Sequence, residues 1–214
     1  QAKDTKKSQD YFLALLNQAI LSKTLFPLAH YTKEEVRQKA LNLNLLVSQK
    51  KDSQEVCFIP HNDYVQFIED YTQKPSLQGD LLNTQGQKVG THKGVYRYTI
   101  GQRRGIGVGL LEPHYVVSLC PLKNQVVVGT KEKVYQPTIG VKILQELEPL
   151  KENQRVFVRI RYRNQGVFAT LHILSPSLVL LKGEEPFFAP ALGQLVAFYN
   201  LEGFLIAAGE LYEN

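Results

Sequence analysis

Cys57 is the strongest candidate for covalent chemistry in this sequence. It stands in the stretch KKDSQEVCFIP, after two lysines and before an apolar pair that ends at a proline. Nearby cations favour the thiolate, the form of cysteine that acts as a nucleophile and accepts sulfur, whereas Asp52 and Glu55 oppose it. A cysteine beside apolar residues is also typical of a packed core. The residues alone therefore leave both interpretations open.

A run of arginines, RVFVRIRYR, is the second candidate. Its arginines fall on odd positions and mostly apolar residues on even ones, so a strand over residues 155–162 would have one basic face. Guanidinium groups this close repel one another unless they meet phosphates or carboxylates. Phosphate contacts and pairing with Glu146, Glu148 and Glu152 are equally compatible with the pattern. The arginines are Arg155, Arg159, Arg161 and Arg163.

A glycine-rich stretch, YTIGQRRGIGVG, is the third candidate. Arg103 and Arg104 stand among four glycines, so backbone amides and guanidinium groups occur together, as in phosphate-contacting loops. A hairpin loop with surface arginines explains the same pattern. The stretch is not a dinucleotide-binding fingerprint, because Pro113 follows too soon for the glycines to open a helix.

The other reactive residue types give no site. Cys120 precedes a turn and is expected to be structural, and the five histidines are scattered singly, so no metal site is predicted. No serine stands in a nucleophile elbow, which argues against a hydrolase. A redox protein with a disulfide between Cys57 and Cys120 is a further alternative.

The elements that must position these residues fall into a helical part and a β-rich part. Apolar spacing predicts helices over residues 10–25, 32–44 and 63–71, with a short strand at 45–48. From Gly79 the pattern changes to short strands, including a hairpin of residues 115–119 and 125–128 around PLKN. Six later runs predict a small barrel: 140–143, 155–162, 167–173, 178–181, 194–199 and 204–211.

Composition adds bounds on the class of protein. The chain has 214 residues, 43% hydrophobic and 21% charged, with a net charge of +5, which is compatible with a polyanionic partner. No run approaches the roughly 18 apolar residues of a membrane span, and no secretory signal opens the chain. We therefore expect a soluble, cytoplasmic protein. The sequence holds no methionine and begins like a cut linker, so we expect a fragment.

The ordered motifs resemble those of the tRNA-specific 2-thiouridylases. The resemblance rests on KSQDYFLALLNQ, LFPLAHYTKEEVR, KKDSQEVCFI, YTIGQRRGIGVG, YVVSLCPLKNQVVVG, RIRYRNQG and GQLVAFYN, in family order from about residue 7 to the end. It implies an α+β multidomain chain. Residues 1–59 would be the helical tail of a catalytic α/β PP-loop domain, 60–131 a mostly β central domain and 132–214 a β-barrel.

The resemblance also implies an activity and its residues. Such enzymes adenylate the wobble uridine of tRNA with ATP and Mg, then replace its oxygen with sulfur carried as a persulfide, here on Cys57. A sulfur-donor protein and a monomeric state are expected. The positions that match tRNA contacts of the family are Lys7, Ser8, Gln9, Arg161, Tyr162 and Gln194, with Arg103 and Arg104 as possible phosphate contacts.

Departures from the family pattern limit this expectation. The family has Thr-Pro before the Gly-Gln that ends in Gln194, where this chain has Ala191-Leu192, and usually an acid at Ser8. The sequence contains no SGGxDS phosphate loop, and the family's second catalytic cysteine lies in the same amino-terminal domain. We therefore expect this chain alone to dock tRNA without ATP or turnover. A non-catalytic RNA-binding module with a structural Cys57 is the alternative.

Overall fold

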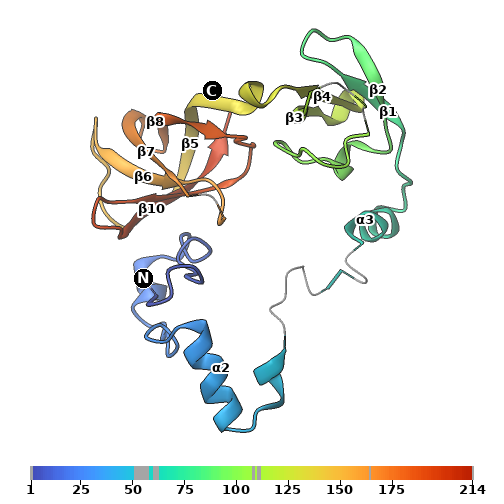
Figure 1. Cartoon of the computed structure of the whole chain (residues 1–214). Coiled ribbons are helices and arrows are strands. Elements are labelled where there is room, and N and C mark those ends of the chain that lie inside the picture. Colours follow the sequence, from blue (N-terminus) through green and yellow to red (C-terminus); the bar gives the residue numbers. More distant parts are fainter. Residues whose placement is uncertain are drawn as a thin grey trace. The chain divides into compact units, whose positions relative to one another are not determined.

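A computed structural model describes residues 2–50, 58–59, 63–107, 109, 112–163 and 165–213 of the chain. Cys57 lies outside the described residues. The chain forms two compact units, of which the first joins Gln1–Lys51 to Pro137–Asn214 and the second is Asp52–Gln136. Figure 1 traces the elements of both along the sequence.

A closed barrel of six strands is the main body of the first unit. In chain order its strands are β5 (Tyr135–Glu146), β6 (Arg155–Arg159), β7 (Val167–Ser175), β8 (Leu178–Phe188), β9 (Leu195–Tyr199) and β10 (Leu205–Tyr212). The order around the barrel is β10-β5-β8-β7-β6-β9, which confirms the predicted six-stranded barrel.

Alternating apolar residues fill this barrel. Val156 and Val158 of β6 are 0% and 1% exposed, and they pack in one cluster with inward residues of the other five strands. Successive side chains of a strand point to opposite faces, so this alternation leaves the odd positions of β6 outside. Gly209 stands where β10 shifts register against β5, and a Cβ there would lie 2.3 Å from the carbonyl oxygen of Lys142, so the close approach requires glycine.

The amino-terminal segment of the first unit contains fewer helical residues than its periodicity predicts. The predicted helix over 10–25 is wrong, because residues 10–15 form turns and the helix α1 covers only Gln18–Leu21. Asn17 is extended and its side chain accepts from the amide of Ile20, so it caps a new helix instead of continuing the preceding turns.

Helix α2 (Lys33–Asn42) confirms the second predicted helix. Thr32 and Glu35 form the reciprocal capping box expected from the sequence. The strand predicted at 45–48 is wrong, since η1 (Leu46–Gln49) is a 3-10 turn. Leu46 is fully exposed, and a strand requires a neighbouring strand for its backbone hydrogen bonds.

A four-stranded sheet forms the centre of the second unit. Its order is β2-β1-β4-β3, where β1 is Gly79–Leu82, β2 is Lys88–His92, β3 is Tyr115–Cys120 and β4 is Gln125–Gly129. The predicted hairpin is confirmed, with η4 (Pro121–Lys123) between β3 and β4 and a left-handed Asn124. Helix α3 (Tyr64–Thr72) confirms the third predicted helix, and the short turns η3 (Val95–Arg97) and η5 (Lys131–Val134) complete the unit.

No helix within the described part of the chain is both long and apolar enough to cross a membrane.

Candidate functional site

The first candidate site is the contact between residues 8–14 and the barrel, which we call the linker seam. Tyr11 and Ala14 are 6% and 0% exposed and lie in a buried cluster with Ala197, Tyr199 and Ala208. Tyr11 and Ala14 are three residues apart in a helical turn, so both side chains face the barrel. The hydroxyl of Tyr11 donates to the backbone oxygen of Leu195 at 2.8 Å, which ties the segment to the start of β9.

An aromatic contact and an arginine border the linker seam. The rings of Phe12 and Tyr162 are 4.7 Å apart, and 61% of Phe12 is exposed. Arg161 donates from Nη2 to the backbone oxygen of Ala189 at 2.8 Å. Burial lowers the pKa of Arg161 from its usual value while the nearby Tyr11 acts in the opposite direction, yet an arginine remains charged at neutral pH.

Buried polar groups lie inside the linker seam. Burial raises the pKa of the Tyr199 hydroxyl, and the neighbouring Asp10 carboxylate raises it further. The guanidinium carbon of Arg159 lies 5.6 Å from the centre of the Tyr199 ring. Nε of Arg159 is buried and makes no hydrogen bond with any described residue. The seam therefore combines an apolar contact with a cationic edge.

The predicted tRNA contacts lie next to these seam residues. Lys7 and Gln9 are exposed, whereas Ser8 is only 8% exposed. Gln194 is half-buried and immediately precedes Leu195, the residue that accepts from Tyr11. The structure thus brings the stretches at 7–9, 161–162 and 194 to one region of the first unit.

The predicted arginine strand is only partly present. β6 ends at Arg159, so Arg161 and Arg163 lie beyond it, and the strand predicted to reach residue 162 is too long. Arg155 forms a bidentate pair with Glu184, at 2.6 and 2.9 Å. Glu152 pairs with His172 instead. The observed partner of Arg155 is therefore none of the three acids that the sequence offered as an alternative to phosphates.

Arg103 and Arg104 lie in the second unit, on an exposed loop. Gln102 closes this loop, since its side chain accepts from the amide of Thr99 at 3.0 Å and donates to the carbonyl oxygen of Arg104 at 2.9 Å. Ile106 is 5% exposed and anchors the loop in the core of the sheet. The arrangement presents two guanidinium groups on a fixed backbone.

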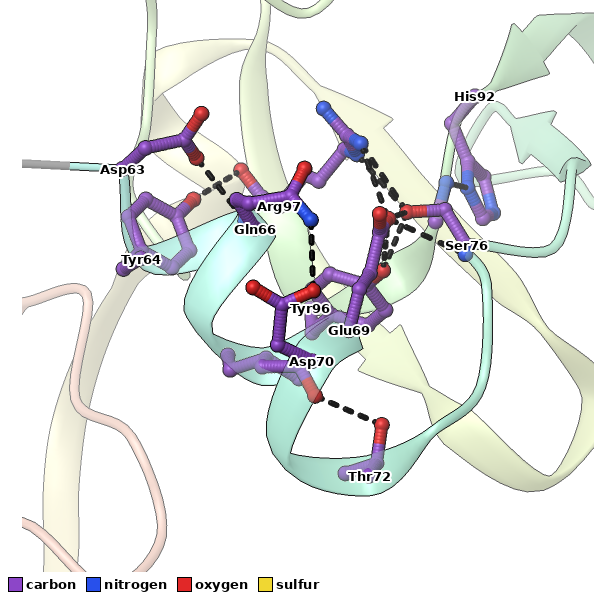
Figure 2. A network of polar contacts seen from close by, with 12 residues as sticks. Asp63, Tyr64, Gln66, Glu69, Asp70, Thr72, Ser76, His92, Tyr96 and Arg97 are labelled. Carbon is purple, nitrogen blue, oxygen red and sulfur yellow. Dashed lines mark hydrogen bonds and ion pairs between the residues drawn. The ribbon is translucent and has the colours of Figure 1, made fainter. Parts of the chain in front are cut away.

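A polar cluster that sequence reasoning missed connects α3 to the sheet unit. Figure 2 shows the carboxylate of Glu69 surrounded by Ser76, Tyr96 and Arg97. Oε1 of Glu69 accepts from the hydroxyl and amide of Ser76, from Tyr96 at 2.8 Å and from Arg97 at 3.3 Å. We call these four residues the Glu69 cluster. The hydrogen bond from Ser76 is the main cause that lowers the pKa of Glu69, followed by that from Tyr96.

The other chemically active residues have structural surroundings. His92 is 1% exposed, and its Nδ1 accepts from the amide of Gly94, which leaves Nε2 to donate to the carbonyl oxygen of Asn124 at 3.1 Å. Cys120 is a half-buried free thiol. Within the described ranges, histidine, cysteine and acidic side chains form no group of three that would hold a metal ion.

Three family models match consecutive parts of the chain. They describe a tRNA methyl transferase HUP domain over residues 1–61, a tRNA methyl transferase PRC-barrel domain over 65–130 and an aminomethyltransferase beta-barrel domain over 138–205. Together with the observed helices, sheet and barrel, these matches confirm the predicted fold class of an α/β domain tail followed by two β-rich parts.

Curated relatives of this chain share one name. The chain is 39% identical over 205 residues to the tRNA-specific 2-thiouridylase MnmA of Lachnoclostridium phytofermentans, covering 95% of this chain and 57% of the relative. It is 40% identical over 200 residues to MnmA of Syntrophotalea carbinolica (91% and 56%) and 38% identical over 213 residues to that of Natranaerobius thermophilus (99% and 58%). The chain therefore spans a little over half the length of these relatives.

Proposed function

Because this chain belongs to the tRNA-specific 2-thiouridylase family, as a part of such a protein, we propose that it serves in 2-thiolation of the wobble uridine of tRNA. In this proposal the chain supplies a tRNA-docking surface and the persulfide cysteine, Cys57. The enzyme is a sulfurtransferase that works in the cytoplasm as a monomer and receives sulfur from a donor protein.

The linker seam is the observation that carries the docking part of the proposal. Tyr11 contacts Leu195 and Phe12 contacts Tyr162, so three stretches that are far apart in sequence meet at one region of the barrel unit. This region presents Lys7 and Gln9 as exposed residues, and the cationic Arg161 lies near Tyr11 of the same segment. Cations fix the position of a nucleic-acid backbone, and an exposed aromatic ring such as that of Phe12 offers a surface on which bases stack.

The sulfur-transfer part rests on Cys57 and its residue type. The Cys57 thiolate takes the outer sulfur of a donor persulfide and releases the donor as a thiolate. The terminal sulfur would then attack the activated C2 of the uridine and displace AMP, and a second cysteine thiolate would cleave the S–S bond and leave a disulfide with Cys57. ATP supplies that activation in the proposal. The sequence contains no SGGxDS string, so these residues offer no phosphate loop of that kind, and we assign ATP and Mg to residues outside this chain.

A comparison of two arginines of the barrel unit tests docking. Arg161→Ala is expected to weaken binding of a tRNA transcript by about tenfold and to lower the slope of log affinity against log salt by about 0.7–0.9, the loss of one phosphate contact. Arg155→Ala is the matched control, because it removes the same charge from a residue already paired with Glu184. Equal effects of both substitutions would mean that tRNA does not bind at the linker seam.

The intact mass of the chain tests the sulfur carrier. After incubation with a persulfide donor, we expect one added sulfur in the native chain and in Cys120→Ser, and none in Cys57→Ser. Cys120 is the matched control because the sequence contains only two cysteines. An added sulfur that survives Cys57→Ser, or none in the native chain, would favour a non-catalytic RNA-binding module in which Cys57 is structural.

A further inference from the structure

We propose that Tyr11 and Ala14, which we call the clamp, are positioning residues that hold residues 7–9 against the barrel. The linker and the barrel then bind tRNA as one preformed surface. This inference rests on the proposed function and adds a role for two residues that contact no RNA in it. Tyr11 and Ala14 are 6% and 0% exposed, so both face protein.

The contacts of the segment fix both its position and its direction. Consecutive residues contact different parts of the barrel: Tyr11 contacts the backbone at the start of β9, and Phe12 contacts Tyr162 beyond the end of β6. Ala14 lies in the buried cluster with Ala197 of β9 and Ala208 of β10. A segment held at three separate points has one orientation relative to the barrel.

The residues around the clamp are consistent with a shared anion-binding surface. Lys6 and Lys7 are exposed, and Arg161 lies close enough to Tyr11 for its charge to act on the hydroxyl. Asp4, the nearest acid before them in sequence, accepts hydrogen bonds from the amides of Lys6 and Lys33. The lysines of the linker and the arginine of the barrel therefore bring positive charge to the region of the clamp, where the half-buried Asp10 carboxylate lies beside Tyr199.

Preorganisation is what the clamp contributes to binding. A flexible segment that becomes ordered only on binding loses conformational entropy at that moment, and this loss reduces affinity. When Tyr11 and Ala14 hold the segment beforehand, Lys7 meets the RNA backbone without that loss. The substitution of either clamp residue should therefore reduce tRNA affinity although neither side chain contacts the RNA.

The experiment combines tryptic cleavage after Lys7 with tRNA binding over a salt series, for Tyr11→Ala and Ala14→Gln. We expect cleavage to accelerate at least tenfold, affinity to fall by about tenfold and the salt slope to fall by about 0.7–0.9, the share of one phosphate contact. Leu15→Ala is the matched control, since Leu15 is in the same segment but 46% exposed, and it should change none of the three.

Two results would overturn the clamp. One is faster cleavage with unchanged affinity and salt slope, which would mean that the position of the linker does not matter for RNA. The other is unchanged cleavage, which would mean that these side chains do not hold the segment. If circular dichroism shows that Tyr11→Ala unfolds the barrel, Tyr11→Phe decides instead, because it keeps the buried ring, removes only the hydrogen bond to Leu195 and should show the same changes at a smaller scale.

The failure of the clamp is distinguishable from failure of the proposed docking site. If the docking site is wrong, the Arg161→Ala and Arg155→Ala variants bind tRNA with equal affinity. If only the clamp is wrong, that difference remains and the Tyr11 and Ala14 variants bind as the native chain does.

Discussion

The linker seam and the Glu69 cluster both attach an amino-terminal segment to a β-rich body, but with different chemistry. At the seam, a tyrosine hydroxyl donates to a backbone carbonyl inside an apolar cluster, and neutral side chains provide most of the contact. In the Glu69 cluster, one carboxylate oxygen accepts from Ser76, Tyr96 and Arg97. The first attachment requires protonated groups, and the second requires an ionised one.

This difference makes the two attachments sensitive to opposite ends of the pH scale. Burial raises the pKa of Tyr11 and Tyr199, so the folded chain holds these protons more tightly than the unfolded chain, and their stabilising effect is lost as pH rises. Hydrogen bonds lower the pKa of Glu69, so the folded chain favours the carboxylate, and its stabilising effect is lost as pH falls.

The largest expected effect is alkaline opening of the linker seam. The contribution of Tyr11 and Tyr199 is complete below the unfolded value near 10 and declines as pH rises through their higher folded values. Absorbance of tyrosinate should show Tyr11 and Tyr199 ionising after most of the eleven tyrosines, and Tyr11→Phe and Tyr199→Phe should each remove one late group.

Tyr98 provides the control for this titration. Burial also raises its pKa, but it lies in the second unit, so Tyr98→Phe should remove a late group without changing seam opening. Cleavage within residues 7–9 by a protease that is active at alkaline pH, measured at each pH, reports the seam itself. Simultaneous ionisation of all tyrosines near pH 10 would contradict a buried seam.

A smaller effect is expected at acid pH, where α3 should separate from its sheet. The contribution of Glu69 is complete above the unfolded value near 4.5 and is lost as pH falls through the lower folded value. Hydrogen exchange of the amides of residues 64–72, corrected for intrinsic rates, should therefore accelerate below pH 4.5 in the native chain. In the Glu69→Gln variant, the same amides should exchange faster already at pH 6, and their exchange rates should change little as the pH is lowered further.

Glu112→Gln is the matched control for that measurement, because Glu112 is an exposed glutamate of the same unit. Its exchange profile should coincide with the native one. If Glu69→Gln also coincides with the native profile, the Glu69 cluster does not hold α3, and hydrogen bonds such as that from Tyr64 to the backbone oxygen of Arg97 must do so.

Local patterns in the sequence are sufficient for the elements but not for these attachments. The alternation of Val156, Val158 and Ile160 predicts inward-facing barrel residues, and all three are buried. The same alternation does not show where pairing stops: β6 loses its partner β7 after Val158, which pairs with Val167, the first residue of β7. The strand prediction therefore extended too far. The alternation nominated Arg161 as one of four arginines, and the family resemblance nominated Arg161 and Tyr162 as tRNA contacts.

The linker seam and the Glu69 cluster depend on contacts between distant parts of the sequence. Tyr11 and Leu195 are 184 residues apart, and Glu69 is 27 residues from Tyr96. No spacing rule connects such pairs. Tyr11 belongs to the predicted helix over residues 10–25, and only the turn geometry before Asn17 shows that its side chain faces the barrel.

The smallest expected effect concerns α2, a helix that neither attachment holds. None of its ten residues is buried, and its first turn is held by the capping box of Thr32 and Glu35 together with polar contacts to Lys3 and Asp4. Thr32→Ala should destabilise this helix by about 1 kcal/mol, the usual contribution of an N-cap. Hydrogen exchange of residues 33–42 should accelerate about fivefold, while cleavage after Lys7 and the thermal midpoint of the barrel stay unchanged.

Thr24→Ala is the matched control, because the hydroxyl of Thr24 donates to the backbone oxygen of Ile20 outside α2. A fall in the barrel midpoint with Thr32→Ala would show that α2 and the linker seam are coupled, and the contrast between a locally capped helix and a segment held by the barrel would then fail.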